Sequence, residues 1–272
     1  MGLMHINNVE IYYECHGQPM NQGQEVLVLI HGYLSSSFSF RKLVPFLEKQ
    51  FAILSIDLPG FGQSEKSLTF NYSLHNYGAL LLDVLKELKV QDAVLVGHSM
   101  GGQIALQAAL QNTEVVKKVI GLAAAGYMGP VKRSLVLASY LPFFSHILKI
   151  YFKKKDIAVN FSQITNKPDL ITQEMMDGYI QPLDSIAFFK SLIKLMRDRE
   201  GDLPPDQLQN IQQPVFLMWG DEDRIVPPRI GERFVKDLPN VHFKIFHKAG
   251  HLLPEELPEE IAQEIARFLQ NS

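Results

Sequence analysis

Short, continuous runs of apolar and often β-branched residues alternate with longer segments of helical spacing along most of this chain. Runs of about four to eight such residues are typical of strands that are covered on both faces, as in a parallel sheet. A sheet covered on both faces needs helices on each side, so the alternation favours an α/β fold. The runs lie at residues 26–30, 51–56, 93–96, 116–122, 215–219 and 241–246.

The segments between the runs complete this pattern. Helical spacing of apolar residues is clearest at 74–88, 102–110 and 254–269. Residues 9–14 alternate between apolar and polar types instead, which predicts a partly exposed edge strand. Strands that alternate with helices predict a doubly wound or related parallel sheet with helices on both faces.

The alternation stops after Gly126 and resumes near Gln213. The residues between them, 127–211, contain no β-rich run, and prolines divide their helical pattern into short helices. We therefore expect a helical cap inserted between two strands and lying over one edge of the sheet. This divides the chain into an α/β core (1–126 and 212–272) and a cap (127–211).

Composition and charge exclude several classes of function. The chain has 272 residues, of which 46% are apolar and 20% are charged, so it can bury a large core. A formal net charge of -3 with interspersed signs provides no basic field for a nucleic-acid backbone. No His, Asp or Cys cluster has metal-ligand spacing, and Cys15 has no partner for an internal disulfide. We expect no cofactor, no metal and no nucleic acid, and a small-molecule partner.

The chain's relation to membranes depends on two segments. The first residues lack a basic start and an apolar stretch, so they do not resemble a secretion signal, and we expect a cytoplasmic protein. Residues 134–152 are apolar and nearly long enough to span a bilayer, but Pro142 lies in their middle. We expect a buried or groove-lining pair of helices there, with peripheral membrane contact as the alternative left open.

The sequence from Gly97 to Gly101 has the arrangement G-x-S-x-G around Ser99. It follows an expected strand and precedes an expected helix, which is the context in which this motif presents a nucleophile. A sharp turn there pushes the serine hydroxyl out above the carboxyl end of the sheet. Side chains at both flanking glycine positions would collide across such a turn. The motif therefore predicts Ser99 as a nucleophile.

A serine hydroxyl needs a base within hydrogen-bond reach and a carboxylate that fixes the tautomer of that base. Asp221 and Asp223 follow the strand at 215–219, and His251 follows the last strand. All three therefore lie at the same edge of the sheet as Ser99. The order Ser, Asp, His is the one expected when such a motif joins a strand to a helix.

Further motifs occur in a fixed order along the chain. They are His31-Gly32-Tyr33, Asp57-Leu58-Pro59-Gly60-Phe61-Gly62-Gln63-Ser64, the turn at Ser99, Gly220 to Pro227, and Gly250-His251.

Through these motifs the chain resembles the α/β-hydrolase superfamily over essentially its whole length. The resemblance implies a mostly parallel, eight-stranded sheet with an inserted helical cap. It also selects Asp223 rather than Asp221 as the catalytic acid, because the family's acid precedes a triplet that ends in Val-Pro. Backbone NH groups must receive the charge that develops on an attacked carbonyl. The resemblance assigns that role, the oxyanion hole, to Tyr33 and Met100.

The remaining histidines of these motifs are expected to be structural. His31 and His98 occupy loop and turn positions of the family pattern, while His251 already has the position of the base. His242 and His247, near the last strand, are expected to face solvent.

Apolar residues of the predicted cap supply the clue to substrate class. An apolar cap favours apolar acyl or aromatic esters over polyanions. We therefore expect a carboxylesterase-like or lipase-like serine hydrolase of the EC 3.1.1 type, acting through an acyl-enzyme. A carbon-carbon bond hydrolase or lyase, a thioesterase, and a small-ligand signalling receptor remain alternatives, and oligomeric state stays open. The candidate pocket residues are Tyr140, Phe143, Phe144, Phe188 and Leu252.

Overall fold

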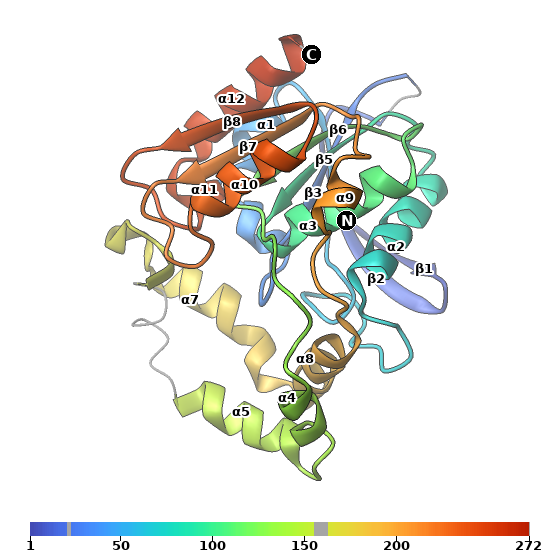
Figure 1. Ribbon diagram of the computed structural model, residues 1–272, viewed down its shortest axis with the longest axis vertical. Coiled ribbons are helices and arrows are strands. Elements are labelled where there is room, and N and C mark those ends of the chain that lie inside the picture. The colour runs from blue at the N-terminus through green and yellow to red at the C-terminus, as the bar shows by residue number, and fades with distance from the viewer. Residues whose placement is uncertain (21–22, 155–162, 272) are drawn as a thin grey trace.

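The computed structural model describes residues 1–20, 23–154 and 163–271. Within these ranges eight strands form one sheet in the order β1-β2-β4-β3-β5-β6-β7-β8 (Figure 1). The strands are β1 (Gly2–Ile6), β2 (Val9–Gly17), β3 (Val26–Ile30), β4 (Ala52–Ile56), β5 (Ala93–His98), β6 (Val116–Leu122), β7 (Val215–Gly220) and β8 (Val241–Phe246).

The sheet is mostly parallel, which confirms the predicted fold class. β3 to β8 pair in parallel, whereas β2 pairs antiparallel with both β1 and β4. Every residue of β3, β4 and β5 is buried, as the continuous apolar runs predict. The strand expected at 9–14 is β2, and it is not the edge strand, because β1 covers its outer side.

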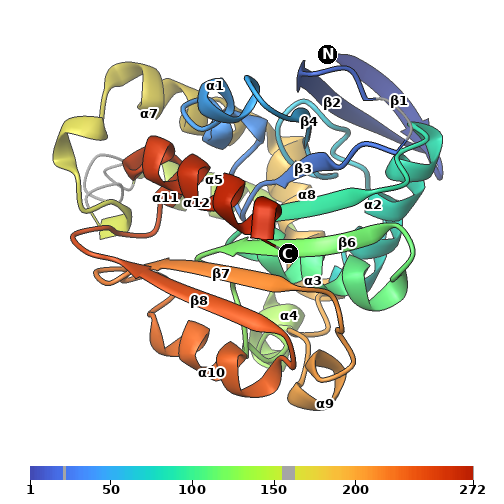
Figure 2. The same cartoon turned by 90° about the horizontal axis from the view of Figure 1, so that it is seen from above.

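Helices cover both faces of the sheet (Figure 2). Because side chains alternate along a strand, Val26, Val28 and Ile30 of β3 belong to one hydrophobic cluster, and Leu27 and Leu29 belong to the other. The first cluster includes residues of α2 (Leu74–Glu87), α3 (Met100–Gln111) and α10 (Arg229–Asp237). The second includes residues of η1 (Ser37–Phe40), α1 (Val44–Leu47), α11 (Leu253–Glu256) and α12 (Pro258–Asn271).

Between β6 and β7 every described regular element is a helix. We call residues 127–211 the helical insertion; its α4, α5, α7 and α8 lie together on one side of the sheet (Figure 1). Its elements are α4 (Arg133–Ala138), α5 (Phe144–Lys154), η2 (Pro168–Leu170), α7 (Gln173–Ile180), η3 (Gln181–Asp184), α8 (Ile186–Asp198) and α9 (Pro205–Leu208).

The apolar segment 134–152 forms the expected pair of helices, α4 and α5, on either side of Pro142. In the described ranges of the chain no helix is long and apolar enough to cross a membrane. The pair is less buried than expected, because α4 buries none of its residues and Ile147, Ile150 and Tyr151 of α5 are exposed. Other helices already cover the two faces of the sheet, and α4 and α5 lie at the outer end of the insertion.

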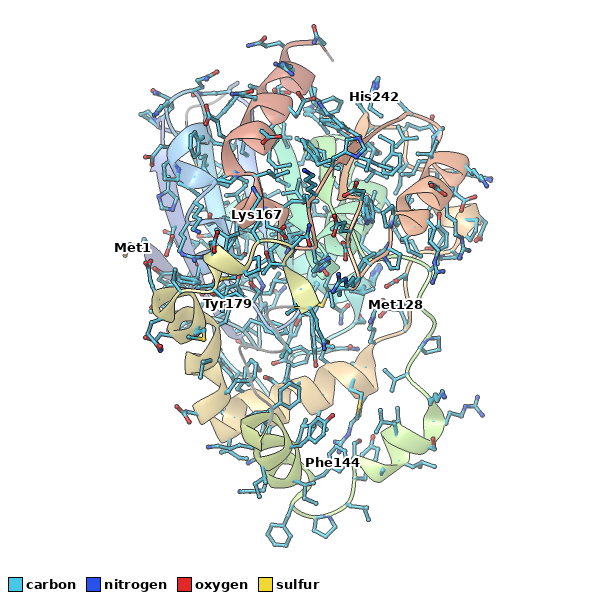
Figure 3. The ribbon with its side chains drawn as sticks, turned by 90° about the vertical axis from the view of Figure 1, so that its left-hand side faces the viewer. Met1, Met128, Phe144, Lys167, Tyr179 and His242 are labelled. Carbon is cyan, nitrogen blue, oxygen red and sulfur yellow. The ribbon has the colours of Figure 1, made fainter. Side chains whose placement is uncertain are left out.

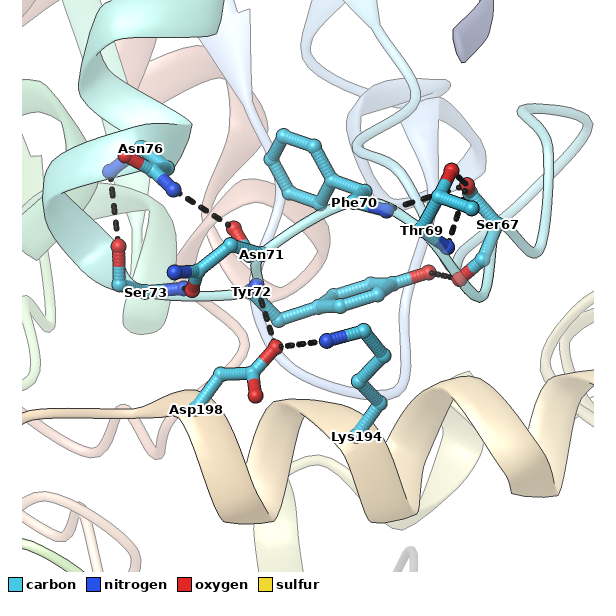
Figure 4. Close-up of polar contacts among 9 residues, drawn as sticks. All are labelled: Ser67, Thr69, Phe70, Asn71, Tyr72, Ser73, Asn76, Lys194 and Asp198. Atoms are coloured by element: carbon cyan, nitrogen blue, oxygen red, sulfur yellow. Dashed lines mark hydrogen bonds and ion pairs between the residues drawn. The ribbon is translucent and has the colours of Figure 1, made fainter.

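Helix α8 is tied to the core through Asp198 (Figure 4). Its carboxylate accepts a hydrogen bond from the backbone NH of Tyr72 at 2.9 Å and pairs with Lys194 at 2.6 Å. Tyr72 is buried, and its hydroxyl donates to the Ser67 carbonyl at 2.7 Å. These contacts join the insertion to the loop that precedes α2.

We expect Asp198→Ala to lower the free energy of unfolding by about 1–3 kcal/mol, because the Tyr72 NH loses its charged acceptor. Denaturant titration followed by circular dichroism measures this change. Asp206→Ala, at an exposed carboxylate of α9, serves as the control and should stay within about 0.5 kcal/mol of the wild type. Equal losses in the two variants would contradict the anchoring role of Asp198.

Candidate active site

Ser99 lies between β5 and α3 in a backbone conformation that L-residues rarely adopt, with φ 53° and ψ −117°. Glycines make this turn possible. A Cβ atom at position 97 would lie 2.3 Å from the Gly101 carbonyl oxygen, and one at position 101 would lie 2.1 Å from that of Ile30. The turn therefore depends on backbones that approach more closely than any side chain allows, and it places Ser99 at the carboxyl end of a central parallel strand.

His251 and Asp223 form a buried pair beside this turn. His251 Nδ1 lies 2.8 Å from Asp223 Oδ2, and Asp223 Oδ1 accepts hydrogen bonds from the backbone NH groups of Ile225 and Val226 at 2.8 Å each. The carboxylate is thus held by three contacts. It keeps the proton of His251 on Nδ1 and leaves Nε2 as the ring atom that can accept a proton.

Asp221, the other acid of this loop, has a different partner. Its carboxylate lies 2.9 Å from Nδ1 of His247, whose side chain is 90% exposed. Slight burial acts to raise the pKa of Asp221, but hydrogen bonds from His247 and from the backbone NH groups of Lys248 and Ala249 outweigh it and lower that pKa. The structure brings Asp223 to His251 and holds Asp221 at the surface.

The loop after β3 brings the Gly32–Tyr33 peptide against Ser99. A Cβ atom on Gly32 would lie 3.0 Å from Cβ of Ser99. His31 fixes this peptide, because its Nε2 accepts from the Leu58 NH at 3.0 Å and its Nδ1 therefore donates to the Gly32 carbonyl at 2.8 Å. Burial lowers the pKa of His31 and keeps the ring neutral.

The two candidate oxyanion donors are positioned by this geometry and by helix α3. The NH of Tyr33 belongs to the same planar peptide as the Gly32 carbonyl, so the orientation of one fixes the other. Met100 is the first residue of α3, and the NH of a first helical residue has no acceptor within its helix. Both NH groups therefore come from rigid parts of the fold that adjoin Ser99.

His98 contacts the backbone and the ring of His251. Its Nε2 donates to the backbone carbonyl of His251 at 2.9 Å, and the two ring centroids are 4.8 Å apart. Burial lowers the pKa of His98 to about 3, so the ring is neutral at ordinary pH. Nδ1 of His98 has no hydrogen-bond partner among the described residues. His98 thus positions the backbone of the candidate base.

A cavity of about 380 Å³ opens in front of Ser99 and His251. The core contributes Leu34, Ile225 and Leu252 to its wall, and the helical insertion contributes Phe152, Ile164, Tyr179, Ile180 and Leu183. Among its described lining residues there is no Lys, Arg, Asp or Glu. The described wall of the cavity is therefore mostly apolar, and it is uncharged outside the candidate catalytic groups.

Of the candidate pocket residues, the structure places only Leu252 on this cavity. Tyr140, Phe143 and Phe144 line a separate hollow at the outer end of the insertion, and Phe188 is buried against Phe61 and Phe189. Figure 3 shows the separation, since Tyr179 lies beside the core and Phe144 lies toward the far end of the insertion. The physical reason is that α7 and η3 reach the cavity, whereas α4 and the turn after it project away from the sheet.

Residues that the sequence did not single out hold the insertion at the cavity. The Tyr179 hydroxyl donates to buried Glu255 at 2.7 Å, and Glu255 pairs with Arg41 at 2.8 Å. Burial, with the nearby Glu255 carboxylate, raises the pKa of Tyr179, so the phenol keeps the proton that it donates. The backbone NH of His251 also donates to the carbonyl of Ile164 at 2.9 Å. Only the pairing of elements in space reveals these contacts.

Within the described ranges no group of three or more His, Cys, Asp or Glu side chains is arranged to hold a metal ion.

Comparisons with known proteins give three findings. The model of the "Alpha/beta hydrolase family" matches residues 27–264. The hydrolase YugF of Bacillus subtilis, described as uncharacterized, is 43% identical over 92% of this chain and 91% of its own length. A 2-hydroxy-6-oxononadienedioate/2-hydroxy-6-oxononatrienedioate hydrolase of Cupriavidus pinatubonensis is 25% identical over 88% of this chain and 84% of its own length.

Solved structures share the fold. A mutant of the meta-cleavage product hydrolase CumD from Pseudomonas fluorescens IP01 superposes with a TM-score of 0.80 at 19% identity. The match covers 99% of this chain and 97% of that one. At this level of identity the similarity shows the fold alone.

We expect the low pKa of His98 to make stability depend on pH. The unfolded histidine has a pKa near 6.5 and the folded one about 3, so neither state is protonated above that window and stability is unaffected there. As the pH falls from 6.5 toward 3, the unfolded chain binds a proton that the folded chain does not, and stability is lost.

Denaturant titrations between pH 6 and pH 4 measure this effect. His98→Gln should reduce the slope of the unfolding free energy by about 1.4 kcal/mol per pH unit, the equivalent of one proton. His242→Gln, at an exposed position, should leave the slope as it is. An unchanged slope in His98→Gln would show that His98 is not kept neutral by the fold.

Proposed function

We propose, from the premise that this chain belongs to the alpha/beta hydrolase family, that it is a serine hydrolase of carboxylic esters. Its substrates would carry small or medium apolar acyl or aromatic groups. One observation carries the proposal: the turn that bears Ser99 and the His251–Asp223 pair open onto the same uncharged cavity.

In the proposed reaction the Ser99 hydroxyl attacks the ester carbonyl while Nε2 of His251 takes its proton. Asp223 keeps the imidazole oriented and stabilises the imidazolium that forms. The resulting oxyanion accepts hydrogen bonds from the NH groups of Tyr33 and Met100, each worth roughly 3 kcal/mol in the transition state. The alcohol then leaves with the proton from His251, and the acyl group stays on Ser99.

Water completes the cycle. His251 removes a proton from a water molecule, which attacks the acyl carbonyl and forms a second oxyanion at the same two NH groups. When this intermediate collapses, the acid leaves and the proton returns to Ser99. The groups that hold the site are main-chain atoms or buried, bonded side chains, so the protein needs little reorganisation between the two steps.

We propose that the helical insertion is the cap of this site. Its Phe152, Tyr179 and Leu183 form one wall of the cavity. The contact of Tyr179 with Glu255 and the contact of Ile164 with the backbone of His251 support this role, because both tie the insertion to the element that carries the base. Closure of such a wall over bound substrate would exclude water from the acylation step.

The charge of the cavity supports neutral substrates. The relative from Cupriavidus is named for substrates that are dioates, which carry two carboxylates. No cationic side chain lines the described wall of the cavity here, and a buried carboxylate without a partner is costly. A carbon-carbon bond hydrolase is the second candidate, favoured by that relative, and its substrate would have to lack buried charges.

The first test uses p-nitrophenyl esters and a fluorophosphonate probe. Ser99→Ala should abolish both labelling and turnover. Asp223→Asn should lower kcat roughly 10³- to 10⁴-fold, since the wrong tautomer of His251 then faces Ser99. Asp221→Asn is the matched control and should retain activity within about threefold, because Asp221 contacts His247 instead. A folded wild type that neither labels nor turns over would refute the hydrolase and favour a ligand-binding receptor.

The second test compares two substrates of similar size. We expect p-nitrophenyl butyrate to exceed mono-p-nitrophenyl succinate in kcat/KM by roughly 10²-fold or more, because the succinate carboxylate enters a cavity without a counter-ion. The comparison is made at pH 7.5 for the wild type. Equal values for the two esters would contradict the preference for neutral substrates, and turnover of vinylogous diketones without ester turnover would favour the carbon-carbon bond hydrolase.

A further inference from the structure

The outer end of the helical insertion exposes an unusual amount of apolar surface. Leu137, Leu141, Phe143 and Ile147 are 70%, 62%, 74% and 59% exposed. Figure 1 shows that α4, α5 and the turn between them, which carry these residues, form the end of the molecule farthest from the C-terminal part of α12. Soluble proteins rarely leave a large contiguous apolar patch without a partner. We call this set the outer apolar surface: Leu135, Leu137, Tyr140, Leu141, Phe143, Ile147, Ile150 and Tyr151.

Packing within the protein does not account for this surface. Helix α5 already has an inner face, on which Leu148 and Phe152 pack against the core. The Phe152 ring lies 5.8 Å from that of Phe189 and lines the cavity in front of Ser99. Ile147 and Ile150 lie on the outer side of the same helix and are exposed. Helix α5 therefore carries apolar side chains on both faces, and the inner face is the one that packs against the core.

The charged residues in the stretch of sequence that carries the outer apolar surface are all basic. The sequence from Val115 to Lys155 contains no Asp or Glu. Within it Lys132 and Arg133 are exposed at the start of α4, and α5 ends at Lys154, within the sequence Lys153-Lys154-Lys155. The chain as a whole is slightly acidic, with a net charge of -3, so this stretch differs in charge from the rest of the sequence.

A hollow of about 470 Å³ is lined by both apolar and basic side chains. Its wall contains Tyr140, Leu141 and Phe143 of the outer apolar surface together with Lys190, Lys194 and Arg197 of α8. Arg197 lies over the Tyr140 ring at 3.8 Å, and Lys194 pairs with Asp198, while Lys190 is exposed at the rim.

We propose that the outer apolar surface docks on a bilayer that contains anionic lipids. The apolar side chains would enter the interfacial region, while the surrounding cations would contact phosphate groups of the lipids. A second copy of the chain fits less well, because pairing two such ends would bring their cations together. An anionic bilayer provides both the apolar phase and the opposite charge that this surface needs.

Docking in this orientation would place α5 between the bilayer and the cavity. One face of α5 would contact lipid while Phe152, on its other face, lines the cavity. Apolar molecules dissolved in the membrane would then be close to the cavity that contains Ser99. The docking itself does not depend on the proposed ester hydrolysis, and it is tested without turnover.

The experiment is flotation of the purified full chain with vesicles of phosphatidylcholine alone or with about 30 mol % phosphatidylglycerol. We expect co-flotation with the anionic vesicles, at least roughly tenfold weaker binding to neutral ones, and a loss of binding in about 0.5 M NaCl. Ser99→Ala should bind like the wild type, so that docking and catalysis are separated.

Two pairs of variants locate the surface. Leu137→Ser with Ile147→Ser should weaken binding by roughly tenfold or more, because two apolar side chains are removed from the interface. Leu3→Ser with Val235→Ser, at exposed apolar positions of β1 and α10, is the matched control and should bind normally. Lys132→Gln with Arg133→Gln should weaken binding to anionic vesicles, whereas Lys86→Gln with Lys236→Gln, at exposed positions elsewhere, should not.

Three outcomes would overturn the proposal. One is the absence of flotation with either vesicle, and another is equal binding by the two serine double variants. The third is a dimer, seen by light scattering, that Leu137→Ser with Ile147→Ser dissociates while vesicle binding is absent, which would assign the surface to a second copy of the chain. Unchanged thermal unfolding of each variant confirms that the comparison is made between folded proteins.

Discussion

The close approach of three backbone segments around Ser99 is the constraint on which the rest of this structure depends. The serine is held at positive φ, and neither Gly97 nor Gly101 leaves room for a Cβ atom against its neighbours. Such strain persists only where the surrounding structure over-determines it. Here the surround is the buried centre of the sheet, where β3, β5 and β6 run parallel and α3 begins directly after the turn.

Buried neutral histidines hold other groups of the site in position through hydrogen bonds. His31 joins the Leu58 NH to the Gly32 carbonyl, and His98 holds the carbonyl of His251. His31 uses both ring nitrogens and His98 uses Nε2, and burial lowers the pKa of both rings. A protonated His31 would lose the nitrogen that accepts from the Leu58 NH, so its low pKa preserves the position of the candidate oxyanion donor.

The helical insertion performs two physically different tasks. Its inner part, with Tyr179 and Ile164, contacts the core through hydrogen bonds beside His251. Its outer part, α4 and much of α5, contributes little to the buried core and is rich in exposed apolar side chains. The apolar residues of the insertion therefore form two sets: one set lines the cavity, and the other is exposed on the outer side.

The sequence by itself determined the order of strands and helices, the fold class and the turn at Ser99, because these depend on local periodicity and on the steric needs of a few glycines. It did not identify β1, a mostly exposed or half-buried strand at the edge of the sheet that has no continuous apolar run of the kind found in β3 and β4. It placed Asp223 and His251 at one edge of the sheet, but the 2.8 Å contact between them depends on two loops that are distant in sequence.

Only the tertiary structure decided which apolar residues of the insertion face Ser99. Apolar spacing tells which residues of a helix share a face, but not which element that face meets. Tyr140, Phe143 and Phe144 therefore looked equivalent to the residues that line the cavity, and the path of the chain after α4 carries them to the outer end instead. Glu255 and Arg41 gave no signal in the sequence either, since their pairing exists only once α11 packs against η1. Short motifs were enough to indicate the candidate catalytic residues, whereas the shape of the cavity depends on how distant segments pack.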